Sequence, residues 1–177
     1  MERRVVITGL GAITPIGNNV NETWESILNK KCGIDEITLF DTTNFKTKLD
    51  AEVKNYNPLD YFDLKQSKRL DRVSQFALIA AREAVTSSGI TKENTDFDKV
   101  GIFVSSGIGG LRTIQEQCNI NFEKGNKKIS PMFIPNSIAN MPSGNIAIEF
   151  GFKGESMSIL TACSSSTHAI GEAYKTI

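Results

Sequence analysis

Apolar residues follow two kinds of pattern along the chain. Short runs rich in β-branched and aliphatic residues predict buried strands at residues 5–9, 99–106 and 156–161. Each run leads into a turn of glycine or other small residues, and apolar residues at helical spacing follow. Strands that alternate with helices in this way pair in parallel, so the pattern predicts a layered α/β fold with a largely parallel sheet.

The helices are predicted from apolar spacing and from cap residues. Residues 71–88 give the clearest helix, because their apolar side chains form one stripe and Gly89 stands at the C-cap position. Asn19 and Glu22 match a capping box, which predicts that a helix begins there. Residues 32–62 are mixed and predict short strands and loops. Further helices are predicted at residues 111–123, at residues 135–149, where Pro142 should start or disturb the helix, and after Cys163.

The composition is that of a globular domain without electrostatic bias. The chain has 177 residues, 40% of them hydrophobic, and its 20 basic residues balance 20 acidic ones. A formal net charge of zero excludes a global attraction to nucleic acid or to an anionic membrane. The three cysteines lack paired spacing, which disfavours a secreted disulfide framework and favours a reducing compartment, by default the cytoplasm.

The first residues imitate a signal peptide, since a basic start precedes an apolar run at residues 5–14. Gly9, Gly11 and Pro15 interrupt that run, and no small-residue cleavage site follows it. It is also far shorter than the roughly 20 apolar residues that span a bilayer. We therefore expect a buried strand that ends in a glycine-rich turn, and no membrane segment.

Two glycine-rich turns, at residues 9–11 and 107–110, are candidates for phosphate binding. Thr14 stands where the first turn would need its third glycine, and the second turn has no lysine in the phosphate-loop position. The alternative is close backbone packing between strand and helix, which also requires glycine.

Cys163 lies where a predicted strand becomes a helix. The unpaired backbone N–H groups and the positive end of the helix dipole at such a place favour a reactive thiolate. On placement alone, a small buried hydrophobe is an equal alternative. Cys32 follows a helix end and Cys118 lies inside a helix, so both are expected to be inert.

His168 is the only histidine and follows Cys163 by five residues. Five residues turn a helix by about 500°, which leaves the two side chains roughly 140° apart. His168 is therefore a poor base for Cys163, and it is expected to be a packed or interfacial helix residue. A cysteine–histidine hydrolase dyad and a metal site are both disfavoured, because the chain offers no second histidine and no paired cysteines.

Two basic clusters interrupt the balanced charge. They form either an ordinary solvated face or a docking surface for a strongly acidic protein partner. Their members are Lys65, Lys68 and Arg69 in the first cluster, and Lys127 and Lys128 in the second.

Several segments together resemble the β-ketoacyl-acyl carrier protein synthases, most closely the type II elongating enzymes of bacterial fatty acid synthesis. The clearest are the opening residues 3–17, the glycine turn at 107–110 and the run Thr161-Ala-Cys-Ser-Ser-Ser166, and the resemblance extends from residue 3 to the end of the chain. Shorter matching pieces are Asp41-Thr42, residues 65–71, residues 128–135 and Asn140-Met141.

The resemblance implies a thiolase-type fold, in which two similar α/β halves stack as alternating layers. Residues 1–177 would be the N-terminal half, with the C-terminal half absent. Cys163 would accept an acyl chain from acyl carrier protein as a thioester, and its own backbone N–H would contribute to an oxyanion hole. Malonyl-acyl carrier protein would then decarboxylate and condense with that acyl group, with no cofactor.

The resemblance also assigns roles to further residues. Ile108 would lie in the acyl pocket, Phe133 would belong to the dimer-related wall of that pocket in a homodimer, and the two basic clusters would face the acidic carrier protein. The two histidines that promote decarboxylation, a supporting lysine and the second oxyanion donor lie in the absent half. Since the chain stops at Ile177 within its last predicted helix, we expect a fragment that is incomplete for full turnover. The alternative is a non-catalytic acyl-binding or assembly fragment of a ketosynthase.

Overall fold

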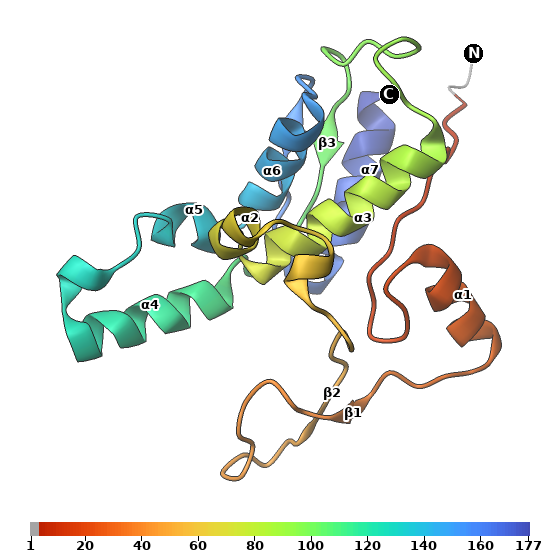
Figure 1. Cartoon of the computed structure of the whole chain (residues 1–177). Coiled ribbons are helices and arrows are strands. Elements are labelled where there is room, and N and C mark those ends of the chain that lie inside the picture. The colour runs from red at the N-terminus through yellow and green to blue at the C-terminus, as the bar shows by residue number, and fades with distance from the viewer. Residues whose placement is uncertain (1–3) are drawn as a thin grey trace. The chain divides into compact units, whose positions relative to one another are not determined.

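The computed structural model describes residues 4–177, so Arg3, the first residue of the matching opening segment, lies outside the described residues. The chain divides into two compact units (Figure 1). The larger unit holds the residues up to Ile7, Pro58–Leu78 and Ile90–Ile177, and the smaller unit holds Thr8–Asn57 and Ile79–Gly89. The boundary therefore crosses one continuous helix, α3 (Arg72–Ser88).

The smaller unit contains α1 (Val20–Leu28), a short hairpin and the second part of α3. The capping box is confirmed, because the Asn19 side chain accepts a hydrogen bond from the Glu22 N–H, while the Glu22 carboxylate accepts one from the Asn18 N–H. The hairpin pairs β1 (Asp35–Glu36) with β2 (Leu49–Asp50) in antiparallel register.

Residues 5–9 do not form the predicted strand, because none of them pairs with another described segment. Ile7 is 83% exposed, whereas the glycines that follow lie directly on α3. A Cβ at Gly9 would lie 2.2 Å from the Ala84 carbonyl oxygen, and one at Gly11 would lie 1.8 Å from that of Ala80. The interpretation of this glycine turn as close backbone packing is therefore confirmed.

Glu83 of α3 fixes this loop at two points. Its two carboxylate oxygens accept hydrogen bonds of 2.9 Å from the backbone N–H groups of Ala12 and Val20. The helix thus supplies both a surface for the glycines and an acceptor for the loop's N–H groups.

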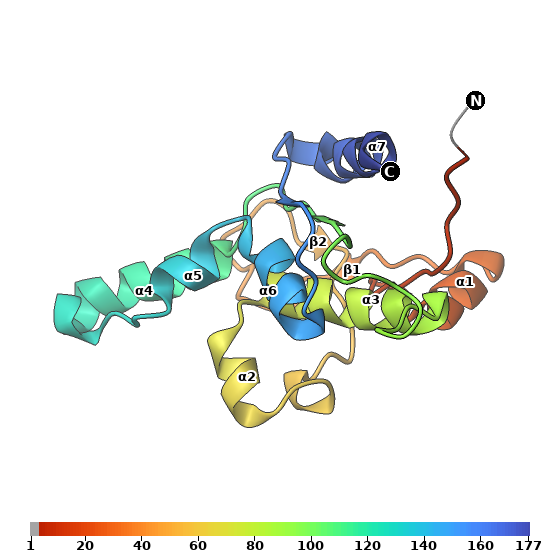
Figure 2. The same cartoon turned by 90° about the horizontal axis from the view of Figure 1, so that it is seen from above.

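The larger unit has a small parallel sheet between helices. β3 (Ile102–Phe103) pairs with β4 (Ser156–Met157), which confirms the parallel pairing. Both α6 (Met141–Phe150) and α7 (Ser165–Thr176) contact β3, which Figure 1 draws between them, and in Figure 2 the two helices lie well apart. This is the layered α/β arrangement that the sequence predicted.

The remaining elements of the unit are η1 (Pro58–Asp60), α2 (Leu64–Arg69), the first part of α3, α4 (Leu111–Lys124), η2 (Asn126–Lys128), α5 (Phe133–Ser137) and η3 (Ala162–Ser164).

Both strands are shorter than the predicted runs, because serine side chains replace the ladder beyond them. The Ser158 hydroxyl donates to the Val104 carbonyl at 2.7 Å, and the Ser105 hydroxyl accepts from the Ile159 N–H at 3.2 Å.

The helix at 71–88 is confirmed together with its left-handed Gly89, whose φ is +70°. The segment 135–149 is split into α5 and α6, and Pro142 lies in the first turn of α6 as expected.

No helix among residues 4–177 is both long and apolar enough to cross a membrane. The helices that face the core bury residues on one side only, as α6 does with Pro142, Ser143 and Ile146.

Glu52 anchors the loop that follows β1. Its carboxylate accepts hydrogen bonds from the Thr38 hydroxyl at 2.6 Å and from the backbone N–H groups of Thr38 and Leu39. The bond from the Thr38 side chain is the main cause that holds the pKa of Glu52 below its ordinary value.

We expect Thr38→Val to raise the pKa of Glu52 toward that of a free glutamate, because the largest stabiliser of the carboxylate is removed. The contribution of Glu52 to stability is present above the ordinary glutamate pKa of about 4.3 and is lost as pH falls through its lowered folded value. An NMR titration of the Glu52 side-chain carbon measures the shift. Thr43→Val is the matched control, since Thr43 bonds Asp41 instead. Equal Glu52 titration curves in both variants contradict the prediction.

Candidate functional site

The two turns singled out in the sequence meet at one end of the small sheet. Because β3 and β4 run parallel, the segments that follow them leave the sheet at the same edge. The glycine turn 107–110 follows β3, and the Cys163 turn follows β4. A Cβ at Gly107 would lie 3.9 Å from the Ala162 carbonyl oxygen, so the backbones of the two turns are neighbours.

Cys163 lies in the tight turn η3, immediately before α7. Ala162 has a φ of +52°, a left-handed conformation that residues other than glycine rarely adopt, and such strain clusters at functional sites. The Cys163 side chain is exposed, which contradicts its interpretation as a small buried hydrophobe. Cys32 and Cys118 are exposed as well, so the turn and the helix start distinguish Cys163, rather than exposure.

Ser165 holds the turn in this shape and is only 3% exposed. Its hydroxyl accepts a hydrogen bond from the Thr161 N–H at 2.9 Å and donates one to the Ala162 carbonyl at 2.7 Å. Both bonds join Ser165 to residues that precede Cys163, so they link the first turn of α7 to the residues before this cysteine. The sequence analysis missed this residue; its signal is a hydroxyl two positions after the cysteine, at the start of a helix.

His168 is not packed, because its side chain is exposed on α7. Its Nδ1 lies 2.7 Å from the Thr161 hydroxyl, and which of the two atoms donates depends on the histidine tautomer. The expectation that His168 is not the base for Cys163 agrees with this contact, which directs the ring toward Thr161.

The glycine turn that carries Ile108 packs on α5, the helix that begins with Phe133. The Gly110 N–H donates to the Ser137 carbonyl at 3.0 Å, and a Cβ at Gly110 would lie 2.0 Å from the Asn136 carbonyl oxygen. Here too the glycines serve close backbone packing. The Ile108 side chain is 64% exposed, and Phe133 is half-buried.

The structure does not bring the two basic clusters together. Lys65, Lys68 and Arg69 lie on α2, whereas Lys127 and Lys128 lie on η2, beyond the far end of α4 (Figure 1). α4 has 14 residues, so the clusters are separated by about 20 Å along it. None of the five side chains forms an ion pair with another residue of the described segment 4–177.

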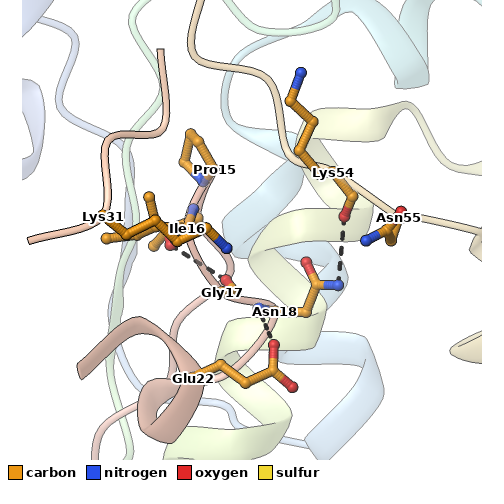
Figure 3. A pocket seen from close by; sticks show the side chains of 9 residues that line it. Pro15, Ile16, Gly17, Asn18, Glu22, Lys31, Lys54 and Asn55 are labelled. Atoms are coloured by element: carbon orange, nitrogen blue, oxygen red, sulfur yellow. Dashed lines mark hydrogen bonds between the residues drawn. The ribbon is translucent and has the colours of Figure 1, made fainter. Parts of the chain in front are cut away.

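No described residues form a group of three or more metal-ligating side chains. A polar hollow of about 80 Å³ lies in the smaller unit, between the turn at Pro15–Asn18 and the backbone of Lys54 and Asn55 (Figure 3). Its carboxylate, Glu22, is occupied in capping α1, and Asn18 donates to the Lys54 carbonyl. The hollow contains none of the residues predicted for chemistry.

We expect Ser165→Ala to slow alkylation of Cys163 by iodoacetamide by about threefold or more, because the turn loses two hydrogen bonds worth about 1 kcal/mol each. Site-resolved mass spectrometry measures the rate, with Cys118 as the reference in the same sample. Ser166→Ala is the control, because Ser166 is exposed and its side chain forms no hydrogen bond with the residues from Arg4 onward. An equal slowing in both variants would show that Ser165 has no special role.

The sequence profile of the β-ketoacyl synthase N-terminal domain matches residues 2–177. The chain is 42% identical over 175 residues to 3-oxoacyl-[acyl-carrier-protein] synthase 2 of Staphylococcus aureus strain N315, covering 99% of this chain and 42% of that protein. The protein of the same name from Coxiella burnetii is 42% identical over 176 residues, again with 99% and 42% covered. The chain thus spans less than half the length of these curated relatives.

Solved structures agree with the fold. One solved structure is described as a type II PKS acyl-carrier protein in complex with its ketosynthase bound to the hexaketide. A chain of that structure aligns with a TM-score of 0.83 at 23% identity, and the alignment covers 99% of this chain and 47% of that chain. The ishigamide ketosynthase/chain length factor aligns with a TM-score of 0.81 at 27% identity, over 97% and 45%. The thiolase-like fold class is therefore confirmed. Profile, relatives and fold agree, and the chain belongs to the β-ketoacyl synthase family, matching its N-terminal domain.

Proposed function

We propose that this chain supplies the acyl-accepting nucleophile of a 3-oxoacyl-acyl carrier protein synthase that acts in fatty acid elongation in the cytoplasm. The observation that carries the proposal is the placement of Cys163. Cys163 is exposed, follows the strained Ala162 and precedes the N-terminus of α7, and the backbone of its turn neighbours the glycine turn of Ile108. Residues 1–177 then form the N-terminal thiolase-like domain of the enzyme, and the rest of the relatives' length corresponds to a C-terminal half.

In the first half-reaction the Cys163 thiolate attacks the carbonyl carbon of an acyl thioester on the carrier protein. A carbon–sulfur bond forms to Cys163, the bond to the carrier's thiol breaks, and that thiol leaves with a proton. The negative charge on the tetrahedral oxygen is stabilised by backbone N–H groups, including that of Cys163, at the start of α7. No metal or cofactor takes part in this transfer.

The second half-reaction joins malonyl-acyl carrier protein to the acyl group on Cys163. Decarboxylation releases carbon dioxide, and the resulting carbanion forms a carbon–carbon bond to the acyl carbonyl carbon. The thioester bond to Cys163 then breaks, the Cys163 thiolate is released, and the β-ketoacyl product leaves on the carrier. As the resemblance implies, we assign the groups that promote decarboxylation to the C-terminal half. His168, the only histidine of this chain, contacts Thr161 and has no part in that assignment. We place Ile108 in the acyl pocket, with Phe133 in its dimer-related wall in a homodimer.

The carrier protein is the partner that fits the basic clusters. Lys65, Lys68 and Arg69 are grouped on one short helix, and none of them forms an ion pair with any of residues 4–177. This favours docking of an acidic domain over internal stabilisation. Lys127 and Lys128 extend the surface at the far end of α4. A structural relative described as an acyl-carrier protein in complex with its ketosynthase supports this choice.

We expect the double change Lys65→Glu and Lys68→Glu to weaken binding of acyl carrier protein by about tenfold or more, chiefly through slower association that depends on salt. Surface plasmon resonance at two salt concentrations measures both effects. Lys46→Glu and Lys48→Glu, exposed in the smaller unit, are the matched control with the same change of charge. Equal weakening by the two pairs would mean that net charge, not α2, governs binding.

The function itself is tested by the intact mass of the 19.4 kDa chain before and after exposure to a long-chain acyl-acyl carrier protein. A mass increase of one acyl group that maps to Cys163 supports the acyl-transfer role. Reversible binding of the donor without any increase in mass contradicts it and favours a non-catalytic acyl-binding fragment.

A further inference from the structure

The basic helix α2 is joined to the first part of α3 by a buried side chain. Gln75 is 5% exposed, and its Nε2 donates hydrogen bonds to the carbonyls of Ser67 at 2.9 Å and Leu70 at 3.1 Å. These carbonyls belong to the C-terminal end of α2 and to its cap. They would otherwise lack a helical partner, so Gln75 fixes the end of α2 to α3.

Asp71, which lies between the C-cap residue of α2 and the first residue of α3, continues the connection to α4. It is 8% exposed; one carboxylate oxygen accepts from the Val73 N–H at 2.9 Å, and the other accepts from the Thr113 hydroxyl at 2.5 Å. Thr113 lies in the first turn of α4. A short hydrogen bond between a buried carboxylate and a hydroxyl is among the strong kind, so α3 and α4 are held together at this point.

The same carboxylate lies against the glycine turn that carries Ile108. A Cβ at Gly110 would lie 3.0 Å from the Asp71 carboxylate carbon. Gly110 is the N-cap residue of α4, and its N–H is held by Ser137 at the end of α5. One buried carboxylate therefore contacts the start of α3, the start of α4 and the turn beside the nucleophile.

We propose that Asp71 is a positioning residue which makes the docking helix α2 and the pocket turn 107–110 behave as one rigid body. A carrier protein that binds α2 then restrains the turn bearing Ile108 before the acyl chain enters. Continuous packed and hydrogen-bonded contacts can transmit such restraint, and a difference in local opening is its observable. The inference rests on the proposed docking of the carrier protein at α2.

Hydrogen–deuterium exchange on the full chain tests the proposal, with saturating acyl carrier protein that bears its phosphopantetheine arm as the probe. Peptides from residues 64–71 report docking, and peptides from residues 105–116 report the turn and the start of α4. We expect exchange to slow about threefold or more in both regions of the unaltered protein. Thr113→Val removes the donor to Asp71 and should abolish the slowing at 105–116 alone, and Thr113→Ser, which keeps a hydroxyl, should restore it.

The outcomes distinguish docking of the carrier protein at α2 from transmission of the resulting restraint to the turn 107–110. Slowing at 64–71 without any at 105–116 in the unaltered protein overturns the inference and leaves docking intact. Slowing at 105–116 that persists in Thr113→Val also overturns it, since Asp71 is then not the connection. No slowing at 64–71 overturns the docking proposal and the inference together. Exchange of peptides from residues 141–157, measured without carrier protein, shows whether each variant keeps the native fold. If Thr113→Val loses the native fold, Asp71→Asn provides a second way to disrupt the bond between Asp71 and Thr113.

Discussion

Replacing Cys163 with alanine is expected to abolish covalent acylation of the chain. Alanine leaves the turn η3 and the start of α7 in place but removes the sulfur atom that we propose forms the thioester. Cys163→Ser keeps an oxygen at the same position, yet a serine hydroxyl without an adjacent base is a far weaker nucleophile, so its acylation should fall by about 100-fold or more. Intact mass after incubation with a long-chain acyl-acyl carrier protein measures both variants.

The other two cysteines provide the controls for this prediction. Cys32 and Cys118 are exposed, like Cys163, but lack its turn, so Cys32→Ala and Cys118→Ala should acylate at the rate of the unaltered chain. An adduct that survives in Cys163→Ala, or that maps to Cys118, would show that exposure and not the turn determines reactivity.

Replacing Gly110 with alanine should have the second large effect, a loss of about 3 kcal/mol in the free energy of unfolding. The new methyl group would meet the backbone oxygen of Asn136 at 2.0 Å and the Asp71 carboxylate carbon at 3.0 Å. The obstacle is mainly backbone, so α4 and α5 must separate to make room. Chemical denaturation followed by circular dichroism measures the change.

Gly144→Ala is the matched control in the same unit. Gly144 lies within α6, and a Cβ there would meet nothing within 4 Å. Since alanine has the higher helix propensity, this change should stabilise the chain by about 0.5–1 kcal/mol. The same sign of effect at both glycines would contradict the packing geometry of the 107–110 turn.

Periodicity predicted the helices well because each depends mainly on local sequence. Residues 71–88, the cap at Asn19 and the position of Pro142 all agree with the structure. It predicted the strands less well, since a strand needs a partner that periodicity does not supply. Two of the three predicted runs contain a two-residue strand, and the run 5–9 contains none. The apolar residues 5–7 have a strand-like pattern but meet no pairing edge among the described residues.

The candidate site was predictable in its chemistry but not in its supports. A cysteine between a strand and a helix is visible as a pattern, and so is a glycine turn. The contacts of Asp71 with Thr113 join residues 42 positions apart, and those of Glu83 with Ala12 join residues 71 positions apart, so no local pattern indicates them. The role of Ser165 is local, but it depends on a left-handed alanine that no propensity favours.

The pairing of β3 with β4 also has a consequence for how the chain reaches its native state. The ladder is only two residues long on each side, and the serine bonds that extend it join positions 54 residues apart. Closing such a loop costs entropy before many contacts repay it, so contacts of this range form late in folding. The helices should therefore appear first, and the geometry around Cys163 should be among the last to be acquired during synthesis or refolding.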